Sequence, residues 1–259
     1  MGILDGKKGL IFGVANERSI AWHIAQHAVE QGAECAFSYL PGEKMEARVR
    51  KSLSNGGLGE AWAFPCDLSS DEDLDQLFSA VGDHFPVIDF VVHSVAYANR
   101  EYLQPGTFTA TPRSVFAQAL DISTYTLIAI ANRAAPLMTS GGSVLALSYY
   151  GAEKAASGYN VMGVAKAALE STARYLAAEL GEKGIRVNSL SAGPCRTLSA
   201  MAVGGIDALL KKVEATAPLR RNIETSEVGK SAVYLLSDLS SGVTGETHHV
   251  DAGYSAIVS

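Results

Sequence analysis

The sequence predicts a single α/β domain built on a doubly wound parallel sheet of about seven strands, with helices on both faces. Short apolar runs rich in β-branched and aromatic residues recur along the chain, and segments with helical periodicity separate most of them. Such alternation requires right-handed crossovers and a parallel sheet covered on both sides. No fixed-period repeat, low-complexity tract or Pro/Gly/Ser-rich linker divides the 259 residues, so we expect one domain over 1–259.

Seven runs have the length and composition of buried parallel strands. They are 9–14, 34–40, 60–66, 87–95, 142–150, 185–192 and 247–253. After the first of them, Ile20, Ile24 and Ala28 recur at a spacing of four, which predicts a helix. Ligands bind beyond the carboxyl ends of the strands in such sheets, so functional residues are expected directly after strands.

The segment 195–221 departs from this rhythm. It places small residues and the run VGG between the sixth predicted strand and the last predicted helix. We therefore expect this segment to be a mobile lid over the substrate.

Composition argues against several classes of protein. The chain has 21 Lys and Arg residues against 27 Asp and Glu, a net charge of −6 that would repel a phosphate backbone, so no nucleic-acid partner is expected. Asn132 and Arg133 interrupt the richest apolar stretch, and the first residues lack the features of a signal peptide. We expect a soluble, cytoplasmic protein with no membrane partner. Three widely spaced cysteines favour reduced, buried thiols over disulfides.

The junction GVANERSIA, after the first predicted strand, has features of an anion site. Gly13 permits a tight turn, and Ser19 is a good N-cap for a helix that begins at Ile20. The free amides and the positive dipole end of that helix favour a pyrophosphate. The full G-x-G-x-x-G fingerprint is absent, and any junction between a strand and a helix can contain Gly and Ser. The pattern alone therefore leaves both interpretations open.

The ends of the third and fourth predicted strands agree with a nucleotide site. Asp67 could accept a hydrogen bond from an adenine amino group, whereas capping of the following helix falls to Ser69 or Ser70. The small residues at 94–96 would let a ribose and a nicotinamide lie against the backbone.

Tyr159 and Lys166 are seven residues apart, so two turns of one helix would place both side chains on the same face. A nearby ammonium favours the ionised form of a phenol and makes it a better proton donor, and it can also hold ribose hydroxyls. A tyrosine and a lysine at this spacing are also common on ordinary amphipathic helices. The position directly after the fifth predicted strand favours a function.

These residues resemble the short-chain dehydrogenase/reductase family, whose catalytic signature is Y-x6-K, and the resemblance covers essentially the whole chain. Ordinary members carry a serine about a dozen residues before the tyrosine, but Ala146 and Leu147 fill that spacing here, and Tyr149 stands ten residues before Tyr159. The runs GVANERSIA, LSYYGAEKAASGYNVMGVAKAALE, LSAGPCRTLSA and TGETHHVDAGYS are similar to the enoyl-acyl-carrier-protein reductase branch of bacterial fatty acid synthesis. A Rossmann fold is implied.

The resemblance implies that the chain reduces a trans-2-enoyl thioester on an acyl carrier protein with NADH. Tyr159 would donate to the developing enolate oxygen, Lys166 would orient the nicotinamide ribose, and Tyr149 would form a wall of the acyl pocket. Substrate would contact Ala98, Tyr149 and Tyr159. Cys195 would meet the carboxamide through its backbone and is not expected to be a nucleophile. Cofactor-binding positions would be Gly13, Ser19, Ile20, Leu40, Asp67, Leu68, Val95, Lys166, Cys195, Arg196, Thr197, Leu198 and Ser199.

Leu40, at the end of the second predicted strand, offers neither a carboxylate for ribose hydroxyls nor an arginine for a 2′-phosphate. We expect a preference for NADH over NADPH, although Lys44 and Arg48 on the next predicted helix could reach a phosphate. No metal is expected, because His23 and His27 lack a third ligand.

The predicted lid has a net positive charge, opposite in sign to that of the whole chain. It has five basic residues against two acids, and we expect an acidic carrier protein to dock there. Alternatively, these charges serve only to keep a helix face soluble. The basic residues are Arg196, Lys211, Lys212, Arg220 and Arg221, and the acids are Asp207 and Glu214.

The resemblance also implies a homotetramer. The alternative functions are a ketone or alcohol reductase of the same family, or a nucleotide-binding regulator without catalysis.

Overall fold

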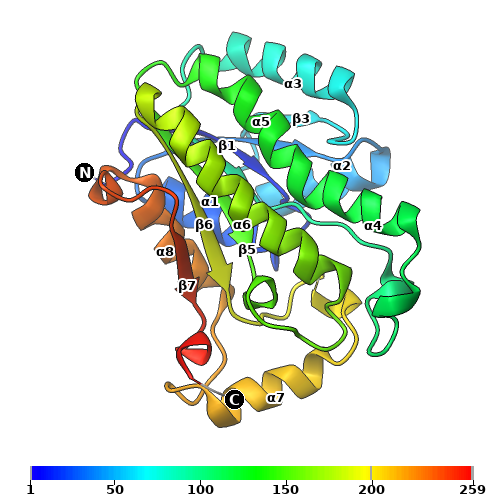
Figure 1. Ribbon diagram of the computed structural model, residues 1–259. Helices are drawn as coiled ribbons and strands as arrows, with labels where there is room; N and C mark the ends of the chain where they lie inside the picture. The colour runs from blue at the N-terminus through cyan, green and yellow to red at the C-terminus, as the bar shows by residue number, and fades with distance from the viewer. Residues whose placement is uncertain (1, 199, 258–259) are drawn as a thin grey trace.

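The computed structural model describes residues 2–198 and 200–257, and it confirms the predicted architecture (Figure 1). Within these residues, seven strands form one sheet in the order β3-β2-β1-β4-β5-β6-β7. All neighbouring strands are parallel. The winding reverses between β1 and β4, which places a ligand crevice at their carboxyl ends. The strands are β1 (Lys8–Phe12), β2 (Glu34–Tyr39), β3 (Ala63–Pro65), β4 (Phe90–His93), β5 (Gly142–Ser148), β6 (Ile185–Ala192) and β7 (Thr247–Val250).

Helices cover both faces of the sheet, as expected. Helices α1, α2 and α8 pack on one face, and α3, α5 and α6 pack on the other (Figure 1). The α-helices in the described part of the chain are α1 (Ile20–Glu30), α2 (Glu43–Asn55), α3 (Asp71–His84), α4 (Arg113–Leu120), α5 (Thr126–Ala134), α6 (Val161–Leu180), α7 (Ile206–Thr216) and α8 (Thr225–Leu236).

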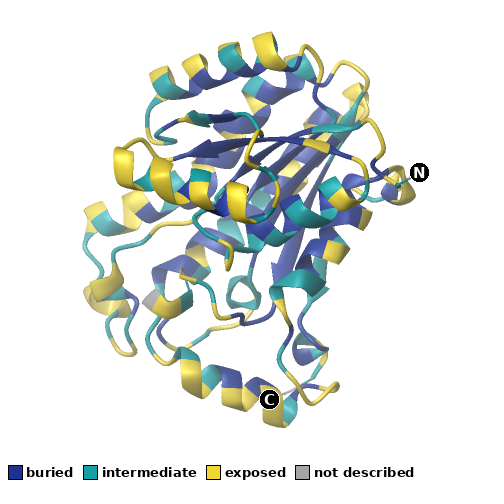
Figure 2. Cartoon of the chain, turned by 180° about the vertical axis from the view of Figure 1, so that it is seen from behind, coloured by how far each residue is buried: buried dark blue, intermediate teal, exposed yellow. Residues whose placement is uncertain are grey.

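The core lies in two layers because side chains alternate along each strand. In β1, Ile11 belongs to the layer beneath α1 and α8, whereas Leu10 and Phe12 belong to the layer beneath α3, α5 and α6. Figure 2 shows the central strands mostly buried between the helices. Burying one such side chain contributes about 1.5–3 kcal/mol, so the two layers hold the sheet rigid beneath the site.

Three neighbouring strands end earlier than the apolar runs predicted. The strands β1, β4 and β5 end at Phe12, His93 and Ser148. The next residues, Gly13, Ser94 and Tyr149, therefore lie outside the ladder at the same edge of the sheet. This arrangement places them where parallel sheets bind ligands.

The predicted lid segment contains a short 3-10 helix, η7 (Ala200–Ala202), followed by α7. In Figure 1, α7 lies beyond the carboxyl ends of the strands, away from the layers that cover the sheet. Its buried side chains are Leu210 and Val213, so one face of the helix packs onto the protein.

The stretch Arg113–Leu137 is long and apolar enough, by composition alone, to cross a membrane. It comprises α4, α5 and short turns, and 44% of its most apolar window is buried inside the protein. A core helix of a soluble protein passes the same test. The expectation that the chain has no membrane partner stays a prediction.

Candidate active site

One cavity of about 1540 Å³ opens at the carboxyl ends of the strands and brings together most of the predicted site residues. Four predicted cofactor positions do not line it, namely Leu40, Asp67, Leu68 and Arg196. Ser199 lies outside the described residues. The predicted residues that line the cavity are Gly13, Ser19, Ile20, Val95, Ala98, Tyr149, Tyr159, Lys166, Cys195, Thr197 and Leu198.

Gly13 forms the floor of the cavity where β1 ends. Its backbone has φ of +98°, and a Cβ atom at this position would stand 2.0 Å from the carbonyl oxygen of Ser94. Any larger residue would push apart the loops that follow β1 and β4. The tight turn predicted for Gly13 is therefore present, and it brings two neighbouring strand ends into direct contact.

The sequence predicted that Ser19 caps α1. Ser19 does stand at the N-cap position, but its hydroxyl does not bond to the amides of the helix. Ser19 Oγ instead accepts hydrogen bonds from the backbone amides of Ala15 and Asn16, both at 3.1 Å. The hydroxyl thus closes the loop after β1. A helix provides no acceptor for its first amides, so those of Ile20 and Ala21 are open to an anion, whereas that of Trp22 donates to the backbone oxygen of Ser19 at 3.1 Å.

The expected adenine residues, Asp67 and Leu68, follow β3, and Leu40, expected to bear on the choice between NADH and NADPH, follows β2. None of the three lines the cavity. Asp67 accepts from the backbone amide and the hydroxyl of Ser69, at 2.9 and 2.7 Å. Ser70 caps α3 by accepting from the amide of Asp73, so one of the two serines weighed for that role performs it. Leu40 is 54% exposed. Contact of Asp67 and Leu68 with an adenine stays a prediction.

Tyr149 and Tyr159 face each other in the cavity. Their ring centroids are 4.7 Å apart with an interplanar angle of 71°, an edge-to-face contact. Tyr149 is the first residue after β5, and Tyr159 lies in the turn before α6, not on the helix as the spacing had suggested. The backbone oxygen of Tyr159 accepts from the amide of Met162, which attaches that turn to the helix.

The ionisation of Tyr159 differs from the expectation. Burial first, and then the neighbouring Tyr149 and Glu170, raise the pKa of the phenol, whereas a nearby ammonium was expected to lower it. The ammonium of Lys166 instead donates to the backbone oxygen of Leu147 at 2.6 Å. Burial also raises the pKa of Tyr149 to about 12. Both phenols are therefore neutral and carry their protons near neutral pH.

Lys166 projects from α6 into the cavity with only 5% of its surface exposed. Burial lowers its pKa to about 8, against an opposing effect of Glu170. His93 lies on the neighbouring β4 and is fully buried, and burial followed by the charge of Lys166 lowers its pKa to about 3. Lys166 is thus a cation that a nearby anion or hydroxyl can readily hold in its charged form.

Sequence reasoning missed Asn160, which follows Tyr159. It is the N-cap of α6 with φ of 47° and ψ of −120°, a strained backbone for a residue with a side chain. Its amide donates to the backbone oxygens of Tyr102 and Gln104, both at 2.8 Å, and to Thr107 Oγ1 at 3.1 Å. The bonds tie the turn that carries Tyr159 to the loop that follows β4. Asparagine before a helix signals only a cap, so nothing in the sequence pointed to this loop.

Sequence reasoning also missed Ser148 and Glu170. Ser148 Oγ donates to Glu170 Oε1 at 2.5 Å, and only 6% and 7% of the two residues are exposed. A serine at a strand end and a glutamate on a long helix are common in solvated positions. No signal in the sequence distinguished this buried pair.

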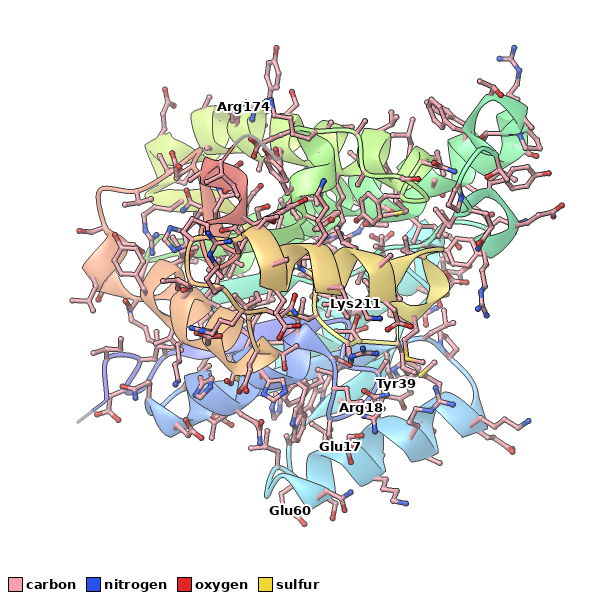
Figure 3. All side chains as sticks on the ribbon, turned by 90° about the horizontal axis from the view of Figure 1, so that it is seen from below. Glu17, Arg18, Tyr39, Glu60, Arg174 and Lys211 are labelled. Atoms are coloured by element: carbon pink, nitrogen blue, oxygen red, sulfur yellow. The ribbon has the colours of Figure 1, made fainter. Side chains whose placement is uncertain are left out.

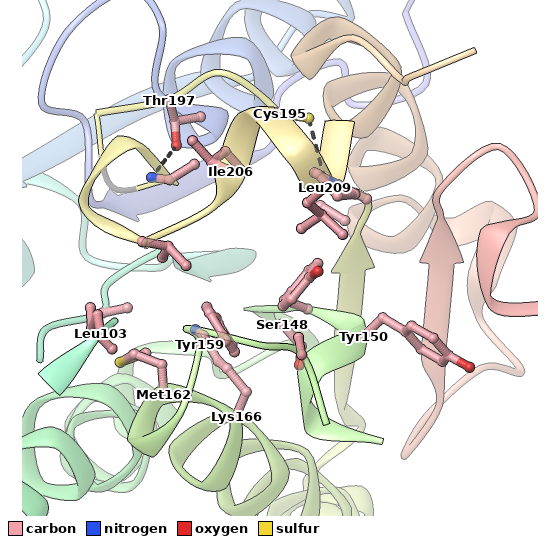
Figure 4. Close-up of a pocket in the computed structure, with 18 of the residues that line it drawn as sticks. Leu103, Ser148, Tyr150, Tyr159, Met162, Lys166, Cys195, Thr197, Ile206 and Leu209 are labelled. Carbon is pink, nitrogen blue, oxygen red and sulfur yellow. Dashed lines mark hydrogen bonds between the residues drawn. The ribbon is translucent and has the colours of Figure 1, made fainter. Parts of the chain in front are cut away.

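The rest of the cavity is mainly apolar. Figure 4 shows Tyr159, Met162 and Lys166 on one side, and Ile206 and Leu209 of α7 on the other. Leu103, from the loop after β4, completes this end. An apolar chain would be enclosed here beside the phenols, which is the environment that an acyl group requires.

The loop after β6 forms the other wall. Thr197 Oγ1 accepts from the amide of Ala200 at 3.1 Å, and Cys195 Sγ donates to the backbone oxygen of Gly193 at 3.4 Å. Burial, with a smaller effect of Glu227, raises the pKa of Cys195 to about 12. A thiol with so high a pKa is a poor nucleophile, in agreement with the expectation that Cys195 is not one. Contact of its backbone with the carboxamide stays a prediction.

The chain matches a family and several proteins of known activity. The family model described as Enoyl-(Acyl carrier protein) reductase matches residues 13–255. The enoyl-acyl-carrier-protein reductase (NADH) 1 of Rhizobium meliloti (strain 1021) is 50% identical over 256 residues, which cover 99% of this chain and 93% of that protein.

Two solved structures are similar over their whole length. The Bacillus cereus enoyl-acyl carrier protein reductase with NADP⁺ and indole naphthyridinone is 46% identical with a TM-score of 0.96, and 100% of both chains is covered. The reductase from Anaplasma phagocytophilum in complex with NAD is 45% identical with a TM-score of 0.94, covering 100% of this chain and 97% of the other.

Proposed function

Because this chain belongs to the enoyl-(acyl carrier protein) reductase family, we propose that its cavity holds NADH beside a trans-2-enoyl thioester and that Tyr159 activates the thioester. The chain is an NADH-dependent enoyl-acyl-carrier-protein reductase of fatty acid elongation, which converts the enoyl thioester to the saturated acyl thioester. The observation that carries the assignment of residues is the meeting of Tyr149, Tyr159 and Lys166 in one cavity with an apolar end.

The residues of the cavity fit the cofactor. Gly13 leaves no Cβ atom at the floor, and the first turn of α1 offers its amides and the hydroxyl of Ser19 to a pyrophosphate. When bound, NADH supplies the hydride for the β-carbon of the enoyl group. Asp67 and Leu68 would hold the adenine at the outer rim, and Val95, Cys195 and the neighbouring loop would hold the nicotinamide half.

Tyr159 acts on the thioester oxygen, where negative charge develops as the β-carbon is reduced. The pKa of its phenol is raised by burial, so the hydroxyl remains a hydrogen-bond donor throughout the working pH range. A donor aimed at developing charge in a site shielded from water lowers the barrier, because it needs no reorganisation as the reaction proceeds.

Lys166 and Tyr149 have supporting roles. The ammonium of Lys166, already held by the backbone oxygen of Leu147, would also bind ribose hydroxyls of the cofactor. Tyr149 contacts the ring of Tyr159 edge-on and limits the positions that ring can take. Ala98, Met162 and Leu209 would contact the acyl chain.

The acyl carrier protein would dock over α7. Two of the predicted basic residues are engaged within this chain, since Arg196 pairs with Asp207 at 2.9 Å and Arg221 pairs with Glu227 at 2.7 Å. The positive charge that remains on the helix itself comes from the two lysines at 211 and 212, both exposed. Figure 3 looks onto α7 and labels Lys211 on this helix.

We also propose that the segment 195–221 moves as a lid and that the enzyme is a cytoplasmic homotetramer. Large apolar side chains are exposed along the chain from α4 to α6, among them Phe116 of α4, Tyr125, Ile128 of α5 and Tyr175 of α6. A second copy of the chain would shield these side chains from water.

One assay tests the function and separates it from the alternatives. The loss of nicotinamide absorbance is followed with crotonyl, longer enoyl and 3-oxoacyl thioesters as substrates. Turnover of the enoyl thioesters with NADH is expected. Turnover of only the 3-oxoacyl thioesters would make the protein a ketone reductase, and cofactor binding without turnover of any of them would make it a regulator.

A further inference from the structure

Two side chains of α6 hold two consecutive residues of β5. Lys166 Nζ donates to the backbone oxygen of Leu147 at 2.6 Å, and Glu170 Oε1 accepts from Ser148 Oγ at 2.5 Å. Lys166 and Glu170 are four residues apart, so they lie one turn apart on the same face of the helix. The next residue of the chain is Tyr149, which enters the cavity and contacts Tyr159.

Glu170 does not line the cavity, yet it is 93% shielded from solvent, since only 7% of its surface is exposed. Burial of a carboxyl group is costly unless it has a hydrogen bond or an opposite charge nearby. Ser148 supplies the hydrogen bond, and His249 and Arg174 also favour the charged form of the carboxyl group. Glu170 in turn favours the charged form of Lys166. A carboxylate in this place has no evident use for the packing of an apolar helix face, which suggests a role in the site.

We propose that Glu170 is a positioning residue of the reductase, which acts through Ser148 on the corner that carries Tyr149 and through its charge on Lys166. This inference rests on the roles proposed above for Tyr159 and Lys166. Loss of the charge would remove the carboxylate that favours the charged form of buried Lys166 and would shift Lys166 toward the neutral amine. Loss of the hydrogen bond would loosen the corner at Leu147 and Ser148 without removing the charge.

The pH dependence expected from this arrangement involves the groups that face the pair. Burial lowers the pKa of Lys166 to about 8, and Glu170 opposes that change. His93 of β4 has a pKa lowered to about 3, and Tyr149 has one raised to about 12, so neither changes charge between about pH 6.5 and 10.

The groups on the outer side of Glu170 are Glu153, His249 of β7 and Arg174 of α6. His249 Nε2 pairs with Glu153 at 2.7 Å. Burial raises the pKa of Glu170, and Glu153 adds to that rise, whereas Ser148, His249 and Arg174 oppose it. The His249→Gln variant therefore belongs in the experiment, because it identifies any limb of the pH profile that belongs to the imidazole.

The test is the pH profile of kcat and of kcat/KM for NADH, measured with crotonyl thioester on the full-length enzyme. Glu170→Gln keeps an acceptor for Ser148 and removes the charge, whereas Ser148→Ala removes the hydrogen bond and keeps the charge. Glu179→Gln is the matched control, because it makes the same change at an exposed position of the same helix. Circular dichroism and the melting temperature report whether each variant is folded.

Glu170→Gln is expected to move the alkaline limb to lower pH by about one unit, because it removes a negative charge that favours the charged form of Lys166. At a pH above the alkaline limbs of both the wild type and the variant, the kcat of the variant would then be about tenfold below that of the wild type. Ser148→Ala is expected to lower kcat by a few-fold at all pH values and to leave the limb in place. Glu179→Gln and His249→Gln are expected to leave the alkaline limb unchanged.

An unmoved alkaline limb in Glu170→Gln, or an equal movement in Glu179→Gln, would overturn the positioning role. If Glu170→Gln does not fold, Glu170→Asp decides, since it keeps the charge and shortens the side chain. Its limb should remain at the wild-type pH while its kcat falls as in Ser148→Ala, and a displaced limb would contradict the inference. Absence of turnover in the wild type would contradict the proposed function instead.

Discussion

Replacement of Tyr159 by phenylalanine tests the central role proposed for the site. The variant removes one hydroxyl and keeps the ring, which packs edge-on against Tyr149 and beside the buried cluster of Leu103, Val161 and Met162. Folding and the shape of the cavity should therefore be preserved. The change in rate then measures the hydroxyl itself.

The size of the loss follows from the environment of the phenol. Burial raises the pKa of Tyr159, so the hydroxyl is protonated and does not share its proton with Lys166, whose ammonium donates to Leu147. Removal of one positioned donor from such a site costs about 2.7–4 kcal/mol of transition-state stabilisation, or roughly 10²–10³ in kcat. The KM for NADH should change little, because the hydroxyl acts mainly on charge that develops in the substrate.

The assay is steady-state turnover of a crotonyl thioester by Tyr159→Phe, with NADH affinity measured separately by fluorescence. Tyr149→Phe is the matched control, because it makes the same change in the neighbouring ring and is expected to retain most of the turnover. Lys166→Ala should damage both turnover and NADH affinity. If Tyr159→Phe kept full turnover while Tyr149→Phe abolished it, the roles of the two tyrosines would have to be exchanged.

Four further results are expected. The specificity constant should be higher with NADH than with NADPH, because Leu40 offers no cation to a 2′-phosphate; the reverse order would contradict this. Lys211→Glu/Lys212→Glu should slow turnover of a carrier-linked substrate but not of a small thioester with the same acyl chain, and salt should weaken only the former; equal salt dependence would exclude docking on α7. Burial raises the pKa of Cys35 to about 12, so the contribution of this thiol to the free energy of unfolding is complete below pH ~9 and is lost as the pH rises toward 12. In urea titrations with reductant, the free energy of unfolding of Cys35→Ala should therefore fall less steeply with pH over this range, by up to about 1.4 kcal/mol per pH unit. Asn160→Gly should melt above Asn160→Ala, because glycine accepts the positive φ at no steric cost, and a reversed order would show that the backbone there is not strained.

The residues that line the cavity could be predicted because their places follow from the sheet. In a parallel sheet, the ends of neighbouring strands meet at one edge, so Gly13, Ser94 and Tyr149 come together although they are far apart in the chain. Apolar runs locate the strands to within a few residues, and the residue after each strand is then known. The spacing of seven also predicted that Tyr159 and Lys166 would share the site, and both line the cavity.

Details that depend on competing local hydrogen bonds were less predictable. A serine such as Ser19 is a favourable N-cap in any sequence. The loop after β1 has amides of its own, however, and two of them donate to the hydroxyl. The spacing of Tyr159 and Lys166 suits two turns of helix, yet the chain turns at Asn160 before α6 begins. Burial likewise outweighs the ammonium in setting the pKa of Tyr159.

The residues that hold the catalytic groups in place were not predictable at all, because their partners are distant in sequence and chemically ordinary. Asn160 bonds to residues 53–58 positions before it, and Glu170 bonds to a serine 22 positions before it. Each pairing becomes visible only when the fold closes the loop after β4 over α6 and sets α6 against β5. A strained backbone at Asn160 and a buried carboxylate at Glu170 each carry an energetic cost. Asn160 lies in the turn that carries Tyr159, and Glu170 bonds to Ser148, which precedes Tyr149. Such a cost is therefore expected to appear in turnover as well as in stability, and this separates both residues from ordinary members of the core.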